Sequence, residues 1–129
     1  MDISKLDILL GDTLVVSNQG VHKPMKLADF NVLLVLAKEE RHGLGIAKAV
    51  DEATKGAVRL GPGTLYRSLK ELAAARLVEP TAAPGGEDDP RRRFYRITEE
   101  GRGRARAEAG RLARLVDVAR ANDVLTEPS

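Results

Sequence analysis

The sequence contains no cysteine and no tryptophan, and only 3% of its 129 residues are aromatic. Without cysteine the chain has no disulfides and no thiolate to act as a nucleophile or metal ligand. Two isolated histidines and scattered carboxylates form no set that resembles an active site, so we expect no enzyme activity, no metal and no cofactor. No apolar run approaches the roughly 18 residues that span a membrane, and the N-terminus lacks the pattern of a secretion signal. These absences predict a cytoplasmic protein without catalytic function.

The chain does contain enough aliphatic residues for a core, and its charge is unevenly distributed. Hydrophobic residues make up 43% of the chain, so one small domain can bury a core of Leu, Val, Ile and Ala. The net charge is only +2, but residues 91–120 hold ten arginines against four acidic residues. Such a local excess of basic charge is typical of a surface that faces phosphates.

The stretch Leu60–Leu72 predicts a sharp turn followed by a helix. Gly61 and Gly63 allow backbone angles that other residues avoid, and Pro62 presets the φ of a first helical residue. We expect Thr64, near the opening, to accept a hydrogen bond from a free amide there.

Within this helix the apolar and polar residues separate onto two sides. Leu65, Leu69 and Leu72 recur at helical spacing and form one narrow apolar stripe. Tyr66 lies on the flank. At roughly 100° per residue, the opposite side carries Thr64, Arg67, Lys70 and Glu71. A helix anchored by leucines and cationic on its outer side fits the major groove of DNA, and the alternative is an ordinary amphipathic surface helix.

Two further helices are predicted before this stretch. Leu27–Glu40 is apolar all round in its middle and must be covered on more than one side, for which a second subunit is one solution. A buried strand is the alternative for this short run, but the flanking helix formers favour a helix. A shorter helix is predicted over Arg41–Thr54, with His42 at its entry. Gly43 and Gly45 resemble half of a dinucleotide-binding motif, but close packing explains them better because the third glycine is missing.

Residues 77–97 predict a β-hairpin. Leu77–Pro80 has the pattern of a short strand, and Arg91–Ile97 alternates as the returning strand. The turn between them, residues 81–90, is rich in acidic residues, glycine and proline. Three helices followed by a hairpin are the outline of a winged helix-turn-helix.

A last helix is predicted from its cap at Thr98 to about Ala121. We expect acid–base pairs such as Glu108 with Arg111 to line its exposed side. Because the small domain is complete before this helix, its late apolar stripe is expected to pack on a second copy of the chain. The alternative is that it folds back on its own domain. The stripe consists of Leu112, Leu115, Val116 and Ala119.

Three segments in this order and spacing resemble the PadR family of bacterial transcriptional regulators, across residues 25–120. The segments are residues 42–47 (HGLGIA), 61–72 (GPGTLYRSLKEL) and 91–101 (RRRFYRITEEG). The resemblance implies a cytoplasmic homodimer that binds operator DNA, usually as a repressor, through the third helix of the winged domain. It also implies that the C-terminal helix and the N-terminal region build the dimer. Leu44 and Phe94 depart from the family pattern, and the C-terminal helix lacks the aromatics on which drug-sensing relatives stack flat ligands.

The predicted fold is mainly α with a small β-hairpin, an α+β arrangement. Residues 1–25 are expected to form an N-terminal arm, either a short helix and a strand or a segment laid on a partner subunit. Residues 26–97 are predicted to form the winged helix-turn-helix domain, and residues 98–125 the dimerisation helix. The predicted partners are a double-stranded operator with an inverted repeat and a second copy of the chain. A small-molecule effector is compatible with this interpretation, but the sequence does not identify one.

The predicted DNA contacts divide into base-reading and backbone-binding groups. Arg67 is the best candidate for a bidentate contact to guanine. Lys48 and the three arginines of the wing are assigned to phosphates or the minor groove. Tyr66 either packs or places its hydroxyl on a phosphate. The full predicted set is Lys48, Gly63, Thr64, Tyr66, Arg67, Lys70, Arg91, Arg92 and Arg93. The alternative function is a winged-helix module for protein interaction or ligand sensing that does not read DNA directly.

Overall fold

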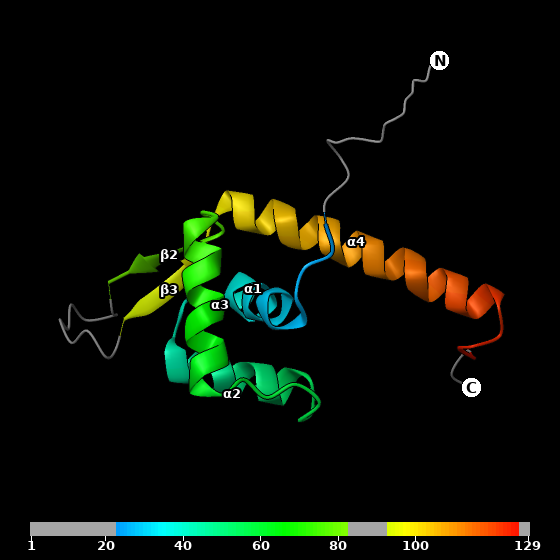
Figure 1. Cartoon of the computed structure of the whole chain (residues 1–129), viewed down its shortest axis with the longest axis horizontal. Coiled ribbons are helices and arrows are strands. Elements are labelled where there is room, and N and C mark those ends of the chain that lie inside the picture. The colour runs from blue at the N-terminus through cyan, green and yellow to red at the C-terminus, as the bar shows by residue number, and fades with distance from the viewer. Residues whose placement is uncertain (1–22, 83–92, 127–129) are drawn as a thin grey trace, which may run out of the picture.

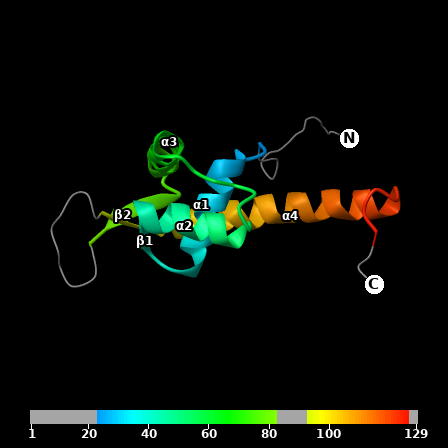
Figure 2. The same ribbon diagram turned by 90° about the horizontal axis from the view of Figure 1, so that it is seen from below.

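The computed structural model describes residues 23–82 and 93–126. Its elements, in chain order, are helix α1 (Leu27–Lys38), strand β1 (Arg41–His42), helix α2 (Gly43–Ala53), helix α3 (Pro62–Ala74), strand β2 (Val78–Thr81), strand β3 (Phe94–Ile97) and helix α4 (Glu99–Ala121). The first three helices and the sheet form one body, and α4 runs past α1 and extends beyond it (Figure 1). After a 90° turn, the second half of α4 again has no other described element beside it (Figure 2). The predicted winged-helix fold with an additional C-terminal helix is confirmed, whereas most of the predicted N-terminal arm and hairpin tip lie outside the described residues.

Helix α1 is the centre of the core. Val32 and Leu33 are fully buried, and Val35 and Leu36 are nearly so. The helix contacts α2, α3, α4 and β3. The chain itself therefore covers most of the apolar run for which a second subunit was one solution, although Leu34 remains 45% exposed.

The sheet contains a strand that the sequence analysis missed. The three strands are antiparallel in the order β1-β3-β2. The sequence predicts a helix from Arg41, but Arg41 and His42 are extended and pair with Tyr95 and Phe94. His42 also caps α2: its Nδ1 accepts a hydrogen bond from the Gly45 N–H at 3.1 Å, and a cap residue has an extended backbone.

Helix α3 confirms the predicted leucine anchor and the predicted start at Pro62, but not the predicted cap. Gly61 is the residue before the helix and has an ordinary extended φ of −70°. No side chain caps the helix, so the predicted capping role of Thr64 is wrong. The reason is positional, because Thr64 already lies inside the helix that Pro62 opens. The buried leucines of the stripe are Leu65, Leu69 and Leu72.

Two polar contacts tie α3 to α1 and the residue before it. The buried Ser68 hydroxyl donates to Asp29 Oδ1 at 2.5 Å, and Lys26 Nζ lies 3.1 Å from Glu71 Oε1. These contacts are far apart in sequence, and they add a fixed orientation to the apolar packing of α3.

Helix α4 begins as part of the core. Thr98 caps it as predicted: its Oγ1 accepts from the Gly101 N–H at 2.9 Å and donates to the Arg76 carbonyl at 2.7 Å. Gly101 and Ala105 are buried, and α4 contacts α1 and β3. The first half of α4 therefore packs on its own domain, and only its second half extends away.

Glu108 corrects the prediction that its pair with Arg111 lies on the exposed side of α4. The Glu108 side chain is only 3% exposed, and Arg111 binds both of its carboxylate oxygens, at 3.1 and 2.6 Å. The Met25 backbone amide donates to the same carboxylate, and the Arg104 guanidinium donates to the Lys23 carbonyl. This cluster fastens the segment before α1 to the middle of α4.

These contacts determine how Glu108 responds to pH. The hydrogen bond from Arg111 is the main cause that holds the pKa of Glu108 below its ordinary value of 4.5, against the opposing effect of burial. A carboxylate with a lowered folded-state pKa stabilises the fold fully above its unfolded pKa, and that stabilisation disappears as pH falls through the folded value.

We therefore expect Glu108→Gln to lower the free energy of unfolding by about 2 kcal/mol at pH 7, because a charge-assisted hydrogen bond is lost. The difference from the wild type should narrow as pH falls below about 4.5. Urea titrations of both proteins between pH 3 and 7, about one pH unit apart, measure this difference in the free energy of unfolding. Glu52→Gln is the control, because Glu52 is an exposed carboxylate on α2. A stability difference that stays constant over this pH range would contradict a lowered pKa for Glu108.

Candidate nucleic-acid interface

The outer side of α3 is exposed, as its sequence pattern predicts. Gly63, Thr64, Arg67 and Lys70 are all exposed, and Tyr66 is 70% exposed. A Cβ added at Gly63 would meet nothing within 4 Å, so the start of the helix is slender on this side. The predicted base-reading residues therefore lie together on one accessible helix face.

Further cationic residues come from the neighbouring elements. Lys48 is exposed on α2, and Arg93 is exposed directly before β3. Arg91 and Arg92, which the sequence also assigns to this surface, lie outside the described residues. Among the described side chains, no carboxylate forms an ion pair with Lys48, Arg67, Lys70 or Arg93. Phosphates in a DNA backbone would give these cations partners.

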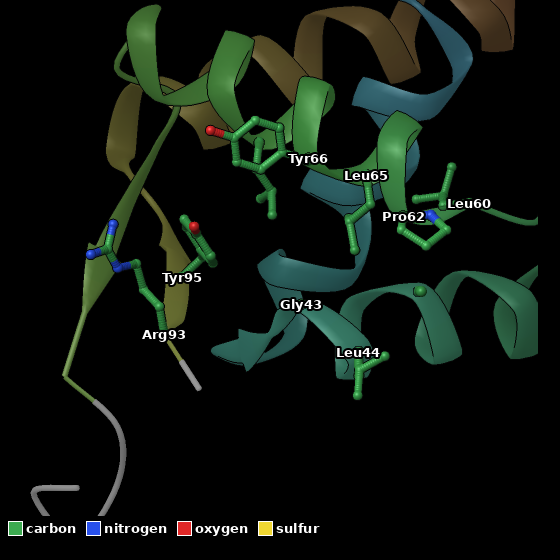
Figure 3. A pocket seen from close by; sticks show the side chains of 10 residues that line it. Gly43, Leu44, Leu60, Pro62, Leu65, Tyr66, Arg93 and Tyr95 are labelled. Carbon is green, nitrogen blue, oxygen red and sulfur yellow. The ribbon is translucent and has the colours of Figure 1, made fainter. Parts of the chain in front are cut away.

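The structure also reveals an apolar feature beside this face that the sequence did not suggest. A cavity of about 420 Å³ opens between α2, α3 and β3. Figure 3 shows α3 above it, α2 below it, and Tyr95 and Arg93 at its left side. Leu44, at the start of α2, is 81% exposed at its edge. Helical periodicity cannot predict this cavity, because its walls come from three separate elements.

The predicted dimerisation stripe divides into two parts. Leu115 and Val116 are 51% and 39% exposed, on the half of α4 that extends from the body. Leu112 is partly buried against the core of its own domain, and Ala119 is also partly buried. Helix α1 adds two exposed leucines that the sequence analysis did not assign to this role, Leu27 at 63% and Leu34 at 45%.

The described residues offer little else that suggests chemistry. They contain no group of three or more histidine, cysteine, aspartate or glutamate side chains placed to hold a metal ion. Within the same residues, no helix combines the length and apolar character needed to cross a membrane.

Three helices, a small antiparallel sheet and an exposed third helix define a winged helix-turn-helix protein. Residues 32–107, more than half of the chain, match the Transcriptional regulator PadR-like family. The chain belongs to this family, which confirms the resemblance seen in the sequence. Members of the family are transcriptional regulators rather than enzymes.

The chain is also similar to individual proteins. A PadR family transcription regulator from Clostridium difficile is 24% identical, with a TM-score of 0.64 over 74% of this chain and 97% of that one. A transcriptional regulator from Clostridium thermocellum is 21% identical, with a TM-score of 0.63 over 73% of this chain and 87% of that one. These two likenesses show the shared fold. An uncharacterized 37.1 kDa protein in transposon TN4556 of Streptomyces fradiae is 38% identical over 88 residues, or 68% of this chain, and the match spans only 24% of that protein.

Proposed function

We propose that the chain is a sequence-specific DNA-binding regulator that places α3 in the major groove of an operator. The observation that carries this proposal is the outer face of α3, where Tyr66, Arg67 and Lys70 are exposed while the leucines on the other side are buried. The buried leucines and the Ser68–Asp29 hydrogen bond hold the helix rigidly, so its outer side chains are presented without a large ordering cost. The chain performs no catalysis in this role, and it works in the cytoplasm where the DNA lies.

The proposal assigns different contacts to different cations. Arg67 makes a bidentate contact to a guanine, while Lys48 and the arginines of the wing bind phosphates. Arg93 belongs to the second group together with Arg91 and Arg92. Support comes from their positions, since Lys48 is exposed on α2 and Arg93 is exposed directly before β3.

The test begins with selection of bound sites from a random DNA pool, followed by alanine substitutions. We expect Arg67→Ala to lose about tenfold, or 1.4 kcal/mol, of the preference for one guanine. Lys48→Ala should weaken binding to all duplexes alike. It should also reduce the slope of log K against the logarithm of salt concentration by about one. Fluorescence anisotropy at several salt concentrations measures both effects.

Arg106→Ala is the matched control, because Arg106 is an exposed arginine on α4 and is not one of the proposed DNA contacts. It should bind every duplex about as the wild type does. Wild-type affinity of both Arg67→Ala and Lys48→Ala for every duplex would show that α3 and α2 are not the DNA-binding surface.

We further propose that two copies associate through the second halves of α4, and that the dimer acts as a repressor on an inverted repeat. The apolar side chains on α4 and α1 that remain exposed support this, because such a surface gains by being covered. The interface comprises Leu112, Leu115, Val116 and Ala119, together with Leu27 and Leu34. A dimer of this kind reads two half-sites about 34–36 Å apart, one helical turn of DNA.

A further inference from the structure

The cluster around Glu108 lies at the point where α4 leaves the body of the domain. Glu108 is the last buried residue of α4, and every residue from 109 to 121 is partly or fully exposed. Figure 1 shows this second half of the helix extending beyond the other elements. At roughly 1.5 Å per residue, it reaches about 20 Å past Glu108. The contacts of Glu108 therefore lie at the base of a long helical extension.

Hydrogen bonds at this point join α4 to the segment that leads into α1. The Met25 amide donates to the Glu108 carboxylate, and the Arg104 guanidinium donates to the Lys23 carbonyl. Arg111 binds both oxygens of the same carboxylate, at 3.1 and 2.6 Å, and so fixes the orientation in which it accepts from Met25. Hydrogen bonds to an ionised acceptor are roughly twice as strong as neutral ones. Loss of the negative charge therefore weakens the whole connection.

The same segment also contacts α3. Lys26 follows directly, and its Nζ lies 3.1 Å from Glu71 Oε1. Both side chains are exposed, so this pair adds little stability by itself, and α3 is held mainly by its buried leucines. Residues 23–26 thus connect the helix that carries the proposed dimer interface with the helix that is proposed to face DNA.

A small change of direction at Glu108 becomes a large displacement at the end of α4. A tilt of about 10° over about 20 Å moves the end of the helix by roughly 3.5 Å, which is close to the rise of one base pair. Two α3 helices in a dimer stay in register with two half-sites only when each α4 is held to within a few degrees.

We propose that Glu108 is a positioning residue for DNA recognition, because its contacts set the direction of α4 and so the half-site spacing that the dimer accepts. This inference rests on the proposed function, including the dimer. With the cluster intact, the link between the two DNA-binding domains is stiff, and a stiff link gives a high effective concentration only at the spacing that it spans. A looser link gives a lower maximum and tolerates more spacings.

The test uses inverted repeats of the selected half-site, with the half-sites moved apart or together one base pair at a time. For the wild type we expect one optimal spacing and a loss of about tenfold in affinity when it changes by one base pair. Glu108→Gln should bind the optimal repeat about threefold more weakly and lose less than about threefold for the same change. Arg111→Gln removes the same ion pair from its more exposed side and should give the same flattened profile. All three proteins should bind a single half-site equally, because α3 is untouched.

Asp117→Asn is the matched control. Asp117 also pairs with an arginine three positions later, Arg120, at 3.4 Å, but it is 75% exposed and lies on the half of α4 that extends from the body. The substitution replaces a carboxylate by an amide, as Glu108→Gln does, and should keep the wild-type spacing profile. A Glu108→Gln protein with the wild-type optimum and the wild-type loss at neighbouring spacings would overturn the proposal. So would equal affinity of the wild type for neighbouring spacings.

The direction of α4 is measured separately and without DNA. The chain has no native cysteine, so spin labels attached to Glu52→Cys on α2 and Ala121→Cys at the end of α4 report one distance between the domain body and α4. An excess of unlabelled protein limits each dimer to one labelled protomer. Glu108→Gln should broaden this distance distribution, and an unchanged distribution would overturn the proposal. If the wild type binds no duplex, the proposed function fails, while the label distances still decide whether Glu108 positions α4.

Discussion

Alanine at Gly101 is expected to destabilise the protein by about 3 kcal/mol or more, because the added methyl group has no room. A Cβ added at Gly101 would lie 2.1 Å from the Leu77 carbonyl oxygen and 2.8 Å from Ile97 Cγ1. The nearest atom belongs to the backbone and cannot rotate away. The substitution therefore has to push the start of α4 from the sheet, which breaks the Thr98 cap and the Thr98 N–H bond to the Leu77 carbonyl.

Gly103→Ala is the matched control for this prediction. Gly103 lies one half-turn further along the same helix, and a Cβ there would meet nothing within 4 Å. Because alanine favours the helix over glycine, Gly103→Ala should stabilise the protein by about 0.5–1 kcal/mol. Thermal and urea unfolding of both variants measure the difference. A Gly101→Ala protein as stable as Gly103→Ala would mean that α4 does not pack on the Leu77 carbonyl.

The second large effect is expected from Leu115→Asp, which should convert the proposed dimer into a monomer. Leu115 is 51% exposed, so the fold itself should tolerate the change within about 0.5 kcal/mol. A buried carboxylate without a partner opposes association, whereas leucine favours it. Loss of the dimer removes the gain from binding two half-sites together, so affinity for an inverted repeat should fall about 100-fold. Light scattering gives the molar mass, and anisotropy gives the affinity.

Arg114→Asp tests whether the stripe, rather than charge on α4, is responsible. Arg114 is adjacent to Leu115 in sequence but projects about 100° around the helix from it, outside the apolar stripe, and Arg114→Asp changes the charge by more than Leu115→Asp does. The dimer and its DNA affinity should survive Arg114→Asp. Binding of Leu115→Asp to a single half-site should equal that of the wild type, which separates loss of association from damage to α3. A Leu115→Asp protein that remains dimeric would contradict the proposed interface.

Local patterns in the sequence predicted the helices and two of the strands correctly. The leucine spacing of α3, the cap at Thr98 and the entry role of His42 depend on residues within a few positions of each other. Such features can be predicted from the sequence because their hydrogen bonds and periodicity involve neighbouring residues. The same reasoning failed for the cap at Thr64, because the helix begins at Pro62 and Thr64 already lies inside its first turn.

Features that depend on contacts between distant residues were not predictable in this way. Strand β1 exists because Arg41 and His42 meet β3, more than 50 positions later. Glu108 has a pattern typical of an exposed helical pair, but in the structure it is buried and accepts a hydrogen bond from the Met25 backbone amide, which is distant in sequence. Sequence spacing carries no information about which distant segment will cover a side chain.

The predicted DNA-contacting set illustrates the same division. Its members on α3 follow from helical periodicity, and the structure confirms that they are exposed. Their use in DNA recognition stays a prediction, as does dimerisation through the stripe on α4.

The sequence alone thus determined the order of the helices and of strands β2 and β3, the apolar and cationic sides of α3, and the family, because these are properties of neighbouring residues and short motifs. The tertiary structure decided that α1 is covered by its own chain, that α4 begins in the core, and that a cavity opens beside α3. The physical reason is that burial and cavities arise where elements meet, and their packing angles are set by side-chain volumes summed over the whole core.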